Sequence, residues 1–446
     1  MEGQFEQLEQ VLDEKILLAI QTPPPAGLTR RDTRAPAIKG KAFAVIGMRR
    51  AGKTSFLHQC RADLIAAGRS PSRLLHFNFE DERLGGLDAA RLGLIPDILF
   101  RLFPKPDAEP LTLFLDEIQR VAGWEVFARR LLDTPGHELF LSGSSARLLS
   151  REIATSMRGR AWEIAIHPFS FREYLRHHQL PIPDDSRRLT SRQRAALDHY
   201  FADYLEIGGF PEAQGLAAAE RRQLLQNHVD VLMLRDVIER HGAGNSTALR
   251  WLVRRLLGNA AGLFSVTRFA ADLQSQGVAA GRDTLREYLA HLEDAFLLQT
   301  LPVATDSIKR RQVNPCKVYP ADTGLIPVFA SGAKPNTGRA LETVVFNALR
   351  PQCVELGYVK TPEGCEVDFL ASRADGSREL IQACASVDAP ETLARETRAL
   401  KSAKALFPDA RCLILTAESR LPFPAVPKGI KILPAWEWLL SEDGAE

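Results

Sequence analysis

In KAFAVIGMRRAGKT, residues 41–54, a short apolar run leads directly into a glycine-rich turn. Residues 43–46 predict a buried strand, and TSFL, residues 54–57, predicts the first turn of a helix. The intervening GMRRAGKT fits GxxxxGK[ST], and a strand before it with a helix after it is the setting of a phosphate-binding loop. The alternative is a glycine turn without a ligand, which this setting disfavours.

Each residue type in this loop has a physical role in holding a polyphosphate. Glycines let the backbone bend until successive N–H groups point inward, and the following helix adds the positive end of its dipole. Lys53 would contact the β- and γ-phosphates, and Thr54 would offer its hydroxyl to Mg²⁺. The sequence therefore predicts ATP and Mg²⁺ as cofactors. The predicted binding residues are Gly47, Arg50, Ala51, Gly52, Lys53, Thr54, Ser55 and Asp116.

The acidic pair Asp116-Glu117 follows an apolar run at residues 111–115 and supplies the second half of the predicted site. A carboxylate at the carboxyl end of a buried strand can hold Mg²⁺, which assigns Asp116 to the metal together with Thr54. Glu117 would orient a water molecule on the γ-phosphate, which favours hydrolysis over transfer to a small acceptor. The alternative is a strand that ends in a solvated acidic turn.

Two further catalytic candidates come from later segments. Ser142, in LFLSGSS with Ser144 and Ser145, would sense the γ-phosphate, although small polar residues after a strand are also common turn formers. Arg160 is a candidate for an arginine that stabilises charge in the same or a neighbouring subunit. Other arginine candidates are Arg49, Arg50, Arg129, Arg130 and Arg158. The predicted catalytic residues are thus Lys53, Glu117, Ser142 and Arg160.

The overall composition limits the class of protein. A chain of 446 residues exceeds what one core usually serves, so roughly two to four domains are expected. The net charge of +2 means that any nucleic-acid contact has to come from a local basic patch. The six cysteines form no CxxC or Cys/His cluster, which predicts a reduced, cytoplasmic protein without structural zinc. No leader-like N-terminus and no membrane-length apolar stretch is present, so we expect no membrane partner.

Strands and helices alternate through the first half of the chain. Residues 5–19 predict an amphipathic helix that three prolines terminate, and a basic linker leads from it to residue 39. Helical segments are expected near residues 54–67, 86–103, 124–133 and 144–157, with strands at 73–80, 111–117, 137–143 and 161–167. Such alternation predicts an α/β fold whose mainly parallel sheet is covered on both faces.

The second half is organised differently. Residues 193–260 predict mostly helices, and Ser265 and Asp283 are expected to cap two further helices. With FLLQTL and CKVYP as strands of a hairpin, this segment predicts a winged helix-turn-helix. The gap SGAKPNTG then leads to a last domain. This domain begins with a helix and continues with the strands YVKT, CEVDFLA, ELIQACA and RCLILTA, with another helix near 390–406.

Several motifs together resemble a prokaryotic AAA-superfamily P-loop ATPase family whose C-terminal domain has no known function. They include GMRRAGKTSFL, LFLDEIQRVAGWEVFARRLLD, HPFSFREYL, KVYPADTGL and GCEVDFL, and the resemblance covers about residues 40–385. It implies a five-stranded parallel core of the additional-strand type, a winged helix and a restriction-endonuclease-like domain. It also gives Lys53, Thr54, Asp116, Glu117 and Ser142 the roles described above. The expected domains are an N-terminal helix and linker (1–38), the ATPase core (39–180), a helical lid (181–260), the winged helix (261–332) and the endonuclease-like domain (333–446).

The last domain lacks part of the pattern that nuclease activity requires. Nucleases of the restriction type hold Mg²⁺ with two carboxylates and use a lysine, which follows an acid by two positions, to help activate water. Glu342 and Asp368 stand at the carboxylate positions, but Gln382-Ala383-Cys384 stands where the acid and lysine are needed. We therefore predict a degenerate nuclease fold without cleavage. The alternative for the two acids is a pair of carboxylates that never bind a metal.

Three functional hypotheses remain open at this point. The leading one is a Mg²⁺-dependent ATPase that drives or switches a DNA-associated module. Its DNA-binding patch would be basic residues near the winged helix, namely Arg282, Arg286, Lys309, Arg310, Arg311 and Lys317. The second is an ATP-binding signalling or toxin-antitoxin-like scaffold with a protein partner, and the third is an ATP-gated nuclease. Oligomerisation is compatible with each of them.

Overall fold

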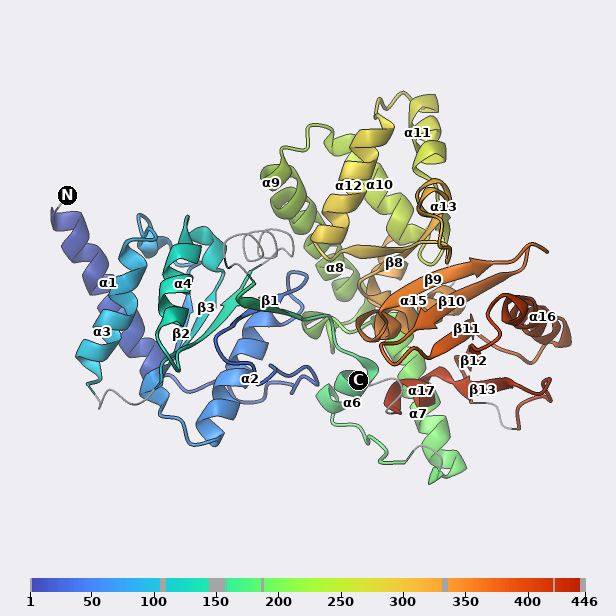
Figure 1. Ribbon diagram of the computed structural model, residues 1–446, viewed down its shortest axis with the longest axis horizontal. Coiled ribbons are helices and arrows are strands. Elements are labelled where there is room, and N and C mark those ends of the chain that lie inside the picture. The colour runs from blue at the N-terminus through green and yellow to red at the C-terminus, as the bar shows by residue number, and fades with distance from the viewer. Residues whose placement is uncertain are drawn as a thin grey trace. The chain divides into compact units, whose positions relative to one another are not determined.

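The computed structural model describes residues 2–104, 110–143, 157, 159–185, 188–330, 336–419 and 422–441. The chain divides after His167 into two compact units, whose elements are labelled in Figure 1. The main elements of the first unit are α1 (Glu2–Gln21), β1 (Ala42–Ile46), α2 (Lys53–Ala66), β2 (Leu74–Asn78), α3 (Leu94–Leu102), β3 (Thr112–Asp116), α4 (Trp124–Asp133), β4 (Glu138–Ser142) and β5 (Ala161–Ala165). The helix expected over residues 144–157 falls almost entirely outside the described residues.

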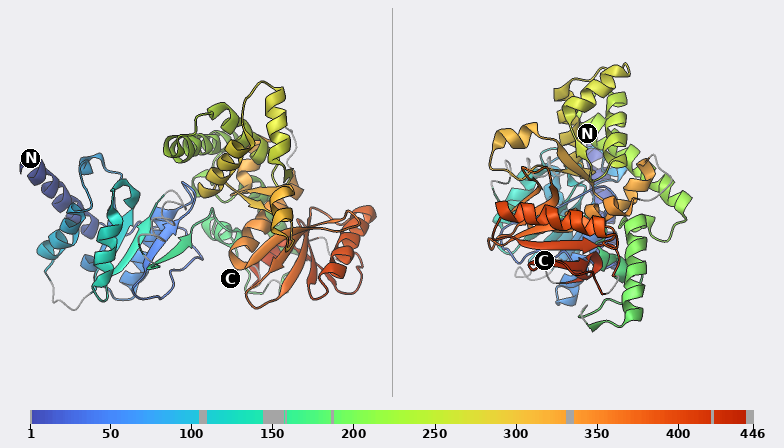
Figure 2. Two further views of the ribbon diagram at one scale, coloured as in Figure 1. Left: turned by 45° about the horizontal axis from the view of Figure 1, so that its top comes forward. Right: turned by 90° about the vertical axis from the view of Figure 1, so that its right-hand side faces the viewer.

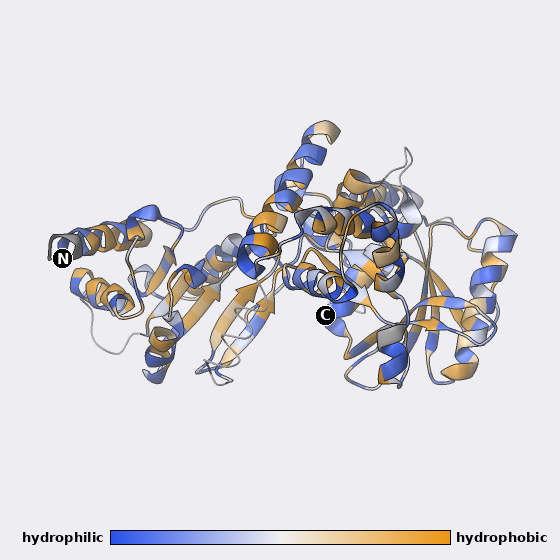
Figure 3. Ribbon diagram, turned by 90° about the horizontal axis from the view of Figure 1, so that it is seen from above, coloured by the Kyte–Doolittle hydropathy of each residue, from blue (hydrophilic) through white to orange (hydrophobic). Residues whose placement is uncertain are grey.

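The sheet of the first unit confirms the predicted parallel α/β fold. Its five strands run in the order β2-β3-β4-β1-β5, and every neighbouring pair is parallel. All residues of β1 and β3 are buried, as expected for central strands with helices on both faces. Figure 3 shows that hydrophobic residues predominate along the strands of this sheet. Because β4 lies between β1 and β3, the carboxyl ends of all three meet at one edge of the sheet.

The N-terminal helix and its linker pack onto this core. Helix α1 lies against β2 and α3, with Leu12 and Ile16 fully buried, and Figure 1 shows α1 and α3 side by side. Lys15 adds an ion pair with Asp81, at 2.7 Å. The predicted N-terminal helix is therefore part of the first compact unit.

The first part of the second unit is mostly helical. It contains α6 (Phe171–His177), α7 (Ser191–Ile207), α8 (Ala218–Leu232), a π-helical segment (Met233–Ile238), α9 (Glu239–His241), α10 (Ser246–Gly258), β6 (Leu263–Phe264), α11 (Val266–Ser275), α12 (Arg282–Asp294), β7 (Leu298–Leu301), α13 (Ile308–Val313), β8 (Cys316–Pro320) and α14 (Ile326–Phe329). Strands β6, β8 and β7 form an antiparallel sheet in that order. The left view of Figure 2 shows the helices that surround it.

The two predicted helix caps in this segment have different outcomes. Ser265 caps α11, because its hydroxyl accepts a hydrogen bond from the backbone N–H of Arg268 at 3.4 Å. The prediction that Asp283 caps α12 is wrong, since the helix begins at Arg282 with Gly281 before it. Asp283 lies instead in the first helical turn and accepts a hydrogen bond from Arg286 at 2.8 Å. A carboxylate there still faces the positive end of the helix dipole.

The chain ends in a second five-stranded sheet. Its elements are α15 (Thr337–Leu349), β9 (Glu355–Lys360), β10 (Glu366–Ser372), β11 (Arg378–Cys384), α16 (Pro390–Leu406), β12 (Arg411–Thr416), β13 (Ile430–Pro434) and α17 (Ala435–Leu440). The strand order is β13-β12-β11-β10-β9, antiparallel from β9 to β11 and parallel from β11 to β13. Strand β13 and helix α17 were not predicted.

Helices cover both faces of this sheet. Phe346 of α15 packs in one core with Phe369 and Ile381, whereas Leu400 of α16 packs in the other core with Leu380 and other strand residues. The right view of Figure 2 shows α16 running alongside the strands on one face of the sheet. The carboxylates on β10 therefore lie in a sheet that helices cover on both faces. No described helix is both long and apolar enough to cross a membrane.

Candidate nucleotide site

The loop between β1 and α2 has the backbone that its glycines predict. Gly47 has a φ of 145° and Gly52 a φ of 98°. A Cβ atom on Gly47 would lie 2.1 Å from the carbonyl oxygen of Ile166, so no side chain fits there. Arg50 also has a positive φ, of 66°. The loop thus follows a tight path that requires glycine at position 47.

Lys53 is held inside this loop. Its Nζ donates hydrogen bonds to the carbonyl oxygens of Gly47 at 3.0 Å and Met48 at 3.1 Å, and the residue is only 7% exposed. The loop is therefore wrapped around its own ammonium group. Ala51 lies buried in the loop, and Ser55 follows on the first turn of α2.

Arg31 supports the loop from the linker, a role that sequence reasoning missed. Its guanidinium donates to the carbonyl oxygens of Ala51 at 2.9 Å and His167 at 2.5 Å. Its backbone is tied to α2 through Gln59, whose side chain accepts from Arg31 N at 2.7 Å. Because Arg31 is only 5% exposed, its side chain supports the loop and is not presented to a ligand from solvent. Its place in a basic, proline-containing linker gave no signal of this contact.

Asp116 joins the loop to the end of β3. Its Oδ2 accepts a hydrogen bond from Thr54 Oγ1 at 2.7 Å, and its Oδ1 accepts one from Ser142 Oγ. Asp116 is 1% exposed, and Ser142 is fully buried. The strand order explains this arrangement, because β4 carries Ser142 between the strands that end at the loop and at Asp116. The structure therefore brings Thr54, Asp116 and Ser142 together.

Glu117 leaves the strand in a left-handed turn, with φ 56° and ψ 40°. Such a conformation costs about 1–3 kcal/mol for a residue other than glycine and is frequent at functional sites. Its backbone N–H donates to Ser142 Oγ at 3.2 Å, and its carboxylate accepts a hydrogen bond from the amide of Gln119. Ser142 thus contacts both acids of the pair. Sequence reasoning missed Gln119 as the group that orients Glu117.

Two histidines lie beside the buried carboxylate. His76 Nε2 is 3.8 Å from Asp116 Oδ2, and its ring stacks on His58 with 4.3 Å between the ring centroids. Burial, followed by the proximity of His58, lowers the pKa of His76 to about 4. His76 is therefore neutral at pH 7 and does not compete with a cation for Asp116. A histidine inside an apolar strand was the available signal, and it was overlooked.

The structure separates Arg160 from these residues. Arg160 precedes β5, and its carbonyl oxygen accepts from the N–H of Ala42 at the first residue of β1. It therefore lies at the amino ends of the strands, opposite the loop, and its exposed side chain pairs with Asp133. This position does not allow contact with phosphates in the same subunit. Ser144, Ser145 and Arg158 lie outside the described residues.

The acidic residues predicted for the C-terminal domain lie in contact with a lysine that was not expected to pair with them. Lys317 of β8 places its Nζ 2.9 Å from Glu342, 2.9 Å from Glu366 and 2.8 Å from Asp368. Gln382 does not face them as a metal ligand, because its side-chain oxygen accepts from the backbone N–H of Asp368 at 3.3 Å. Within the described residues, no group of three or more His, Cys, Asp or Glu side chains is suited to hold a metal ion.

The proposed DNA-binding patch is smaller than predicted. Lys317 is 3% exposed and occupied by carboxylates, so its assignment to the patch was incorrect. Arg311 pairs with Glu355 at 2.6 Å, and Arg286 pairs with Asp283. Arg282, Lys309 and Arg310 remain exposed.

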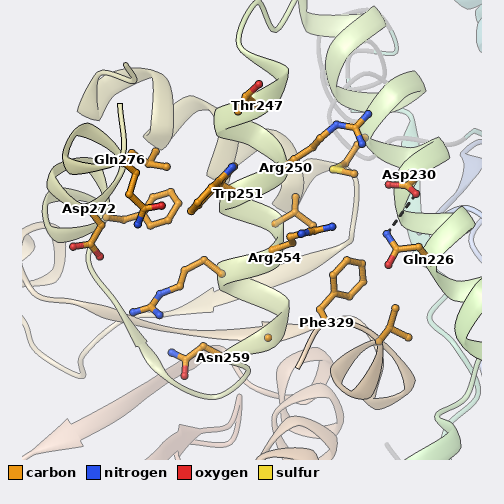
Figure 4. Close-up of a pocket in the computed structure, with 17 residues that line it drawn as sticks. Gln226, Asp230, Thr247, Arg250, Trp251, Arg254, Asn259, Asp272, Gln276 and Phe329 are labelled. Carbon is orange, nitrogen blue, oxygen red and sulfur yellow. Dashed lines mark hydrogen bonds between the residues drawn. The ribbon is translucent and has the colours of Figure 1, made fainter. Parts of the chain in front are cut away.

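A second basic surface lies on α10. The exposed side of this helix carries Arg250, Trp251, Arg254 and Arg255, and Trp251 is 43% exposed. They line a cavity of about 1070 Å³ together with residues of α8, α11 and α14. Figure 4 shows the side chains of Arg250, Trp251 and Arg254 along α10 in this cavity, with Asp230 and Asp272 at its sides. In the described part of the chain, the guanidinium groups of Arg250, Arg254 and Arg255 form no ion pair.

Comparison with known proteins gives a consistent family assignment. Residues 39–175 match a family described as an AAA domain, and residues 198–336 match a domain of unknown function, DUF8612. The chain is 32% identical over 442 residues to the uncharacterised protein MJ1544 of Methanocaldococcus jannaschii, covering 97% of this chain and 95% of that protein. An uncharacterised protein of Haemophilus influenzae is 28% identical over 349 residues, which cover 78% of this chain and 82% of that protein.

Among solved structures, a Walker-type ATPase of Pyrococcus abyssi matches with 14% identity and a TM-score of 0.38. The match covers 72% of this chain and 95% of that one. A TM-score of this size does not establish a shared overall architecture.

Proposed function

Since this chain belongs to the same family as MJ1544 and matches an AAA domain over residues 39–175, we propose that it binds ATP with Mg²⁺ and hydrolyses it. The observation that carries the proposal is the hydrogen bond of 2.7 Å between Thr54 Oγ1 and Asp116 Oδ2. It joins the end of the phosphate-binding loop to the acidic strand end, two segments that are 62 residues apart. Neither half alone would make a nucleotide site.

The donor set suits Mg²⁺. Thr54 and Asp116 supply hard oxygen ligands, which Mg²⁺ prefers, and their oxygens already lie within hydrogen-bond distance of one another. When bound, the ion would neutralise charge on the β- and γ-phosphate oxygens. Lys53 would add its ammonium from the loop interior, after exchanging at least one carbonyl contact for a phosphate oxygen. The loop N–H groups and the start of α2 would hold the remaining oxygens.

Glu117 is the residue that we assign to water activation. Glu117 follows the strand in a left-handed turn, and the side-chain amide of Gln119 orients its carboxylate. Ser142 is a positioning residue, because it bonds both the Asp116 carboxylate and the Glu117 N–H. If a change of charge at the γ-phosphate moved Asp116, the hydroxyl of Ser142 would transmit that movement to the backbone of Glu117. Ser142 is therefore placed to act as a sensor of the γ-phosphate.

An ATPase assay with two loop and acid variants tests this function. Lys53→Ala should lose both nucleotide binding and turnover, whereas Glu117→Gln should retain binding and lose turnover. Arg160→Ala is the matched charge-removal control at the opposite edge of the sheet, and it should keep both. Undiminished turnover in purified Lys53→Ala protein would refute the proposal.

We further propose that nucleotide state acts on a DNA-associated module in the second unit. The order α10, β6, α11, α12, β7 and β8, with three antiparallel strands, supports a winged helix-turn-helix. We assign the phosphate contacts to α10. Three of the six residues in the originally predicted patch are engaged by carboxylates, whereas Arg250, Arg254 and Arg255 are exposed and form no ion pair with any residue that the structure describes.

Charge and stacking argue for nucleic acid as the ligand of this α10 surface. Guanidinium groups one helical turn apart can contact successive phosphates of a strand. Trp251 beside them offers an exposed ring on which a base can stack. The two aspartates at the sides of the cavity reduce its net charge, so we expect moderate affinity with a strong dependence on salt.

Binding and ATPase assays with single- and double-stranded DNA test this second proposal. Arg250→Gln with Arg254→Gln should weaken binding by roughly tenfold or more, and Lys309→Gln with Arg310→Gln should weaken it less. The reverse ranking would return the contact to the wing. If DNA neither binds the protein nor changes its ATPase rate at any salt concentration, and another protein co-purifies with it, the result would favour the scaffold hypothesis.

A further inference from the structure

The Lys317 cluster joins four charged groups, of which Lys317 and Asp368 are buried and Glu366 is partly exposed. One ammonium group contacts the carboxylates of Glu342, Glu366 and Asp368 at 2.8–2.9 Å. Lys317 is 3% exposed and Asp368 is 6% exposed. The hydroxyl of Tyr319 donates to the same Glu342 oxygen at 2.7 Å. Such a cluster is costly to desolvate, so its components must compensate one another.

The geometry matches a lysine and leaves no place for a metal ion. An ammonium group has three N–H donors, and each of the three carboxylates lies within hydrogen-bond distance of Nζ. A divalent ion between the same oxygens would have to occupy the position of Nζ. The two remaining candidate ligands are also engaged, since Asp368 Oδ2 accepts from Ala383 N at 3.0 Å and Gln382 accepts from Asp368 N.

We propose that the Lys317 ammonium permanently replaces a divalent cation in the C-terminal domain, which makes this domain a closed structural module that neither binds a metal nor cleaves nucleic acid. The lysine comes from β8 of the three-stranded sheet, whereas the acids come from α15 and β10. The ion cluster therefore also fastens the three-stranded sheet to the C-terminal sheet. This inference is independent of the proposed ATPase activity.

The surroundings of the cluster make the proposal testable. A cavity of about 640 Å³ reaches Glu366, Asp368 and Gln382 from the side of α16. A cation from solvent therefore has a route to the carboxylates once the lysine side chain no longer contributes its charge. The same cavity carries Arg395 and Arg398, which keeps the region from being uniformly acidic.

The decisive experiment compares Mn²⁺ binding and thermal unfolding of the full chain without nucleotide. The wild type should bind no Mn²⁺ that depends on Asp368, and any difference in its melting temperature between MnCl₂ and EDTA should persist in Asp368→Asn, because Asp116 at the nucleotide site can also attract Mn²⁺. Lys317→Met should lower the melting temperature by roughly 10 °C, because three carboxylates lose their cation. Mn²⁺ should restore part of that loss, and adding Asp368→Asn should abolish the restoration.

Two controls keep the outcome unambiguous. Lys309→Met removes an exposed lysine from α13 and should change neither stability nor Mn²⁺ binding. Lys317→Arg keeps the charge and should not gain Mn²⁺ binding. Mn²⁺ binding to the wild type that Asp368→Asn removes would overturn the proposal, and so would a Lys317→Met protein that is as stable as the wild type. If Lys317→Met does not fold, the wild-type titration still decides.

Discussion

Two buried carboxylate sites in this chain contain similar residues but differ in where their lysine points. At the nucleotide site, Asp116 is bonded by the hydroxyls of Thr54 and Ser142, while Lys53 donates to carbonyl oxygens of its own loop. At the C-terminal site, Lys317 donates directly to Asp368 and Glu342. The first arrangement keeps a carboxylate and an ammonium apart, and the second combines them.

This difference decides what each site can do. A carboxylate that faces hydroxyl groups keeps its negative charge available to an incoming cation, and an ammonium that faces carbonyls can exchange them for phosphate oxygens. A carboxylate cluster that already holds an ammonium has no such capacity, because any incoming cation must first displace the lysine. The presence of acids and a lysine in a pocket therefore does not define a catalytic site.

The same substitution at both sites should separate the two roles most strongly. Asp116→Asn should lower ATP turnover by roughly 100-fold or more, because the metal loses a charged ligand. Asp368→Asn should leave turnover unchanged and alter thermal stability instead. Steady-state ATPase rates and melting curves of both variants measure this contrast. If Asp368→Asn lost as much turnover as Asp116→Asn, the C-terminal site would not be purely structural and the proposed contrast would be wrong.

The next effect concerns the support of the phosphate-binding loop. Arg31→Ala should destabilise the first unit by about 2–4 kcal/mol and weaken nucleotide binding, because the carbonyl groups of Ala51 and His167 lose their buried donor. Denaturant unfolding and nucleotide titration provide the measurements.

The neighbouring arginine supplies a matched control for this prediction. Arg30 pairs with Asp63 on the surface, where both side chains are about half exposed, so Arg30→Ala should cost less than about 1 kcal/mol. Equal effects of the two substitutions would show that Arg31 does not support the loop.

A pH dependence should distinguish the closed cluster from the open site. Burial, with Asp368 nearby, raises the pKa of Glu342 from 4.5 to about 7. The folded state therefore holds this proton more tightly than the unfolded state, and the resulting stability is complete below pH 4.5 and lost as the pH rises through 7. The contribution is roughly 3 kcal/mol over the whole range from pH 4.5 to 7. Glu342→Gln should flatten the decline in unfolding free energy between pH 6 and 8.

Asp322 defines the window for that measurement. Burial raises the pKa of Asp322 to about 6, so its own contribution is lost mainly below pH 6. A decline between pH 6 and 8 that Glu342→Gln leaves unchanged would contradict the assignment to Glu342.

The sequence was sufficient for the parts of the molecule that local pattern determines. The apolar run before Gly47 and the run before Asp116 each predicted a strand, and their carboxyl ends had to meet because the sheet is parallel. The contacts of Arg31 and Lys317 were not predictable in this way. Each depends on a side chain that reaches a partner at least 20 residues away along the chain, and no periodicity or spacing encodes such a contact.

The smallest expected effect is that of Arg160→Ala, and it tests how far the open site extends. In an isolated subunit the side chain pairs only with exposed Asp133 among the contacts described for it, so stability should change by less than about 0.5 kcal/mol. Turnover should also remain at the wild-type level, because Arg160 lies at the amino ends of the strands while phosphates would bind at the carboxyl ends. Measuring ATPase rates over a range of protein concentrations gives the control for assembly. A concentration-dependent rate that Arg160→Ala abolishes would show that this arginine completes the site of a neighbouring subunit.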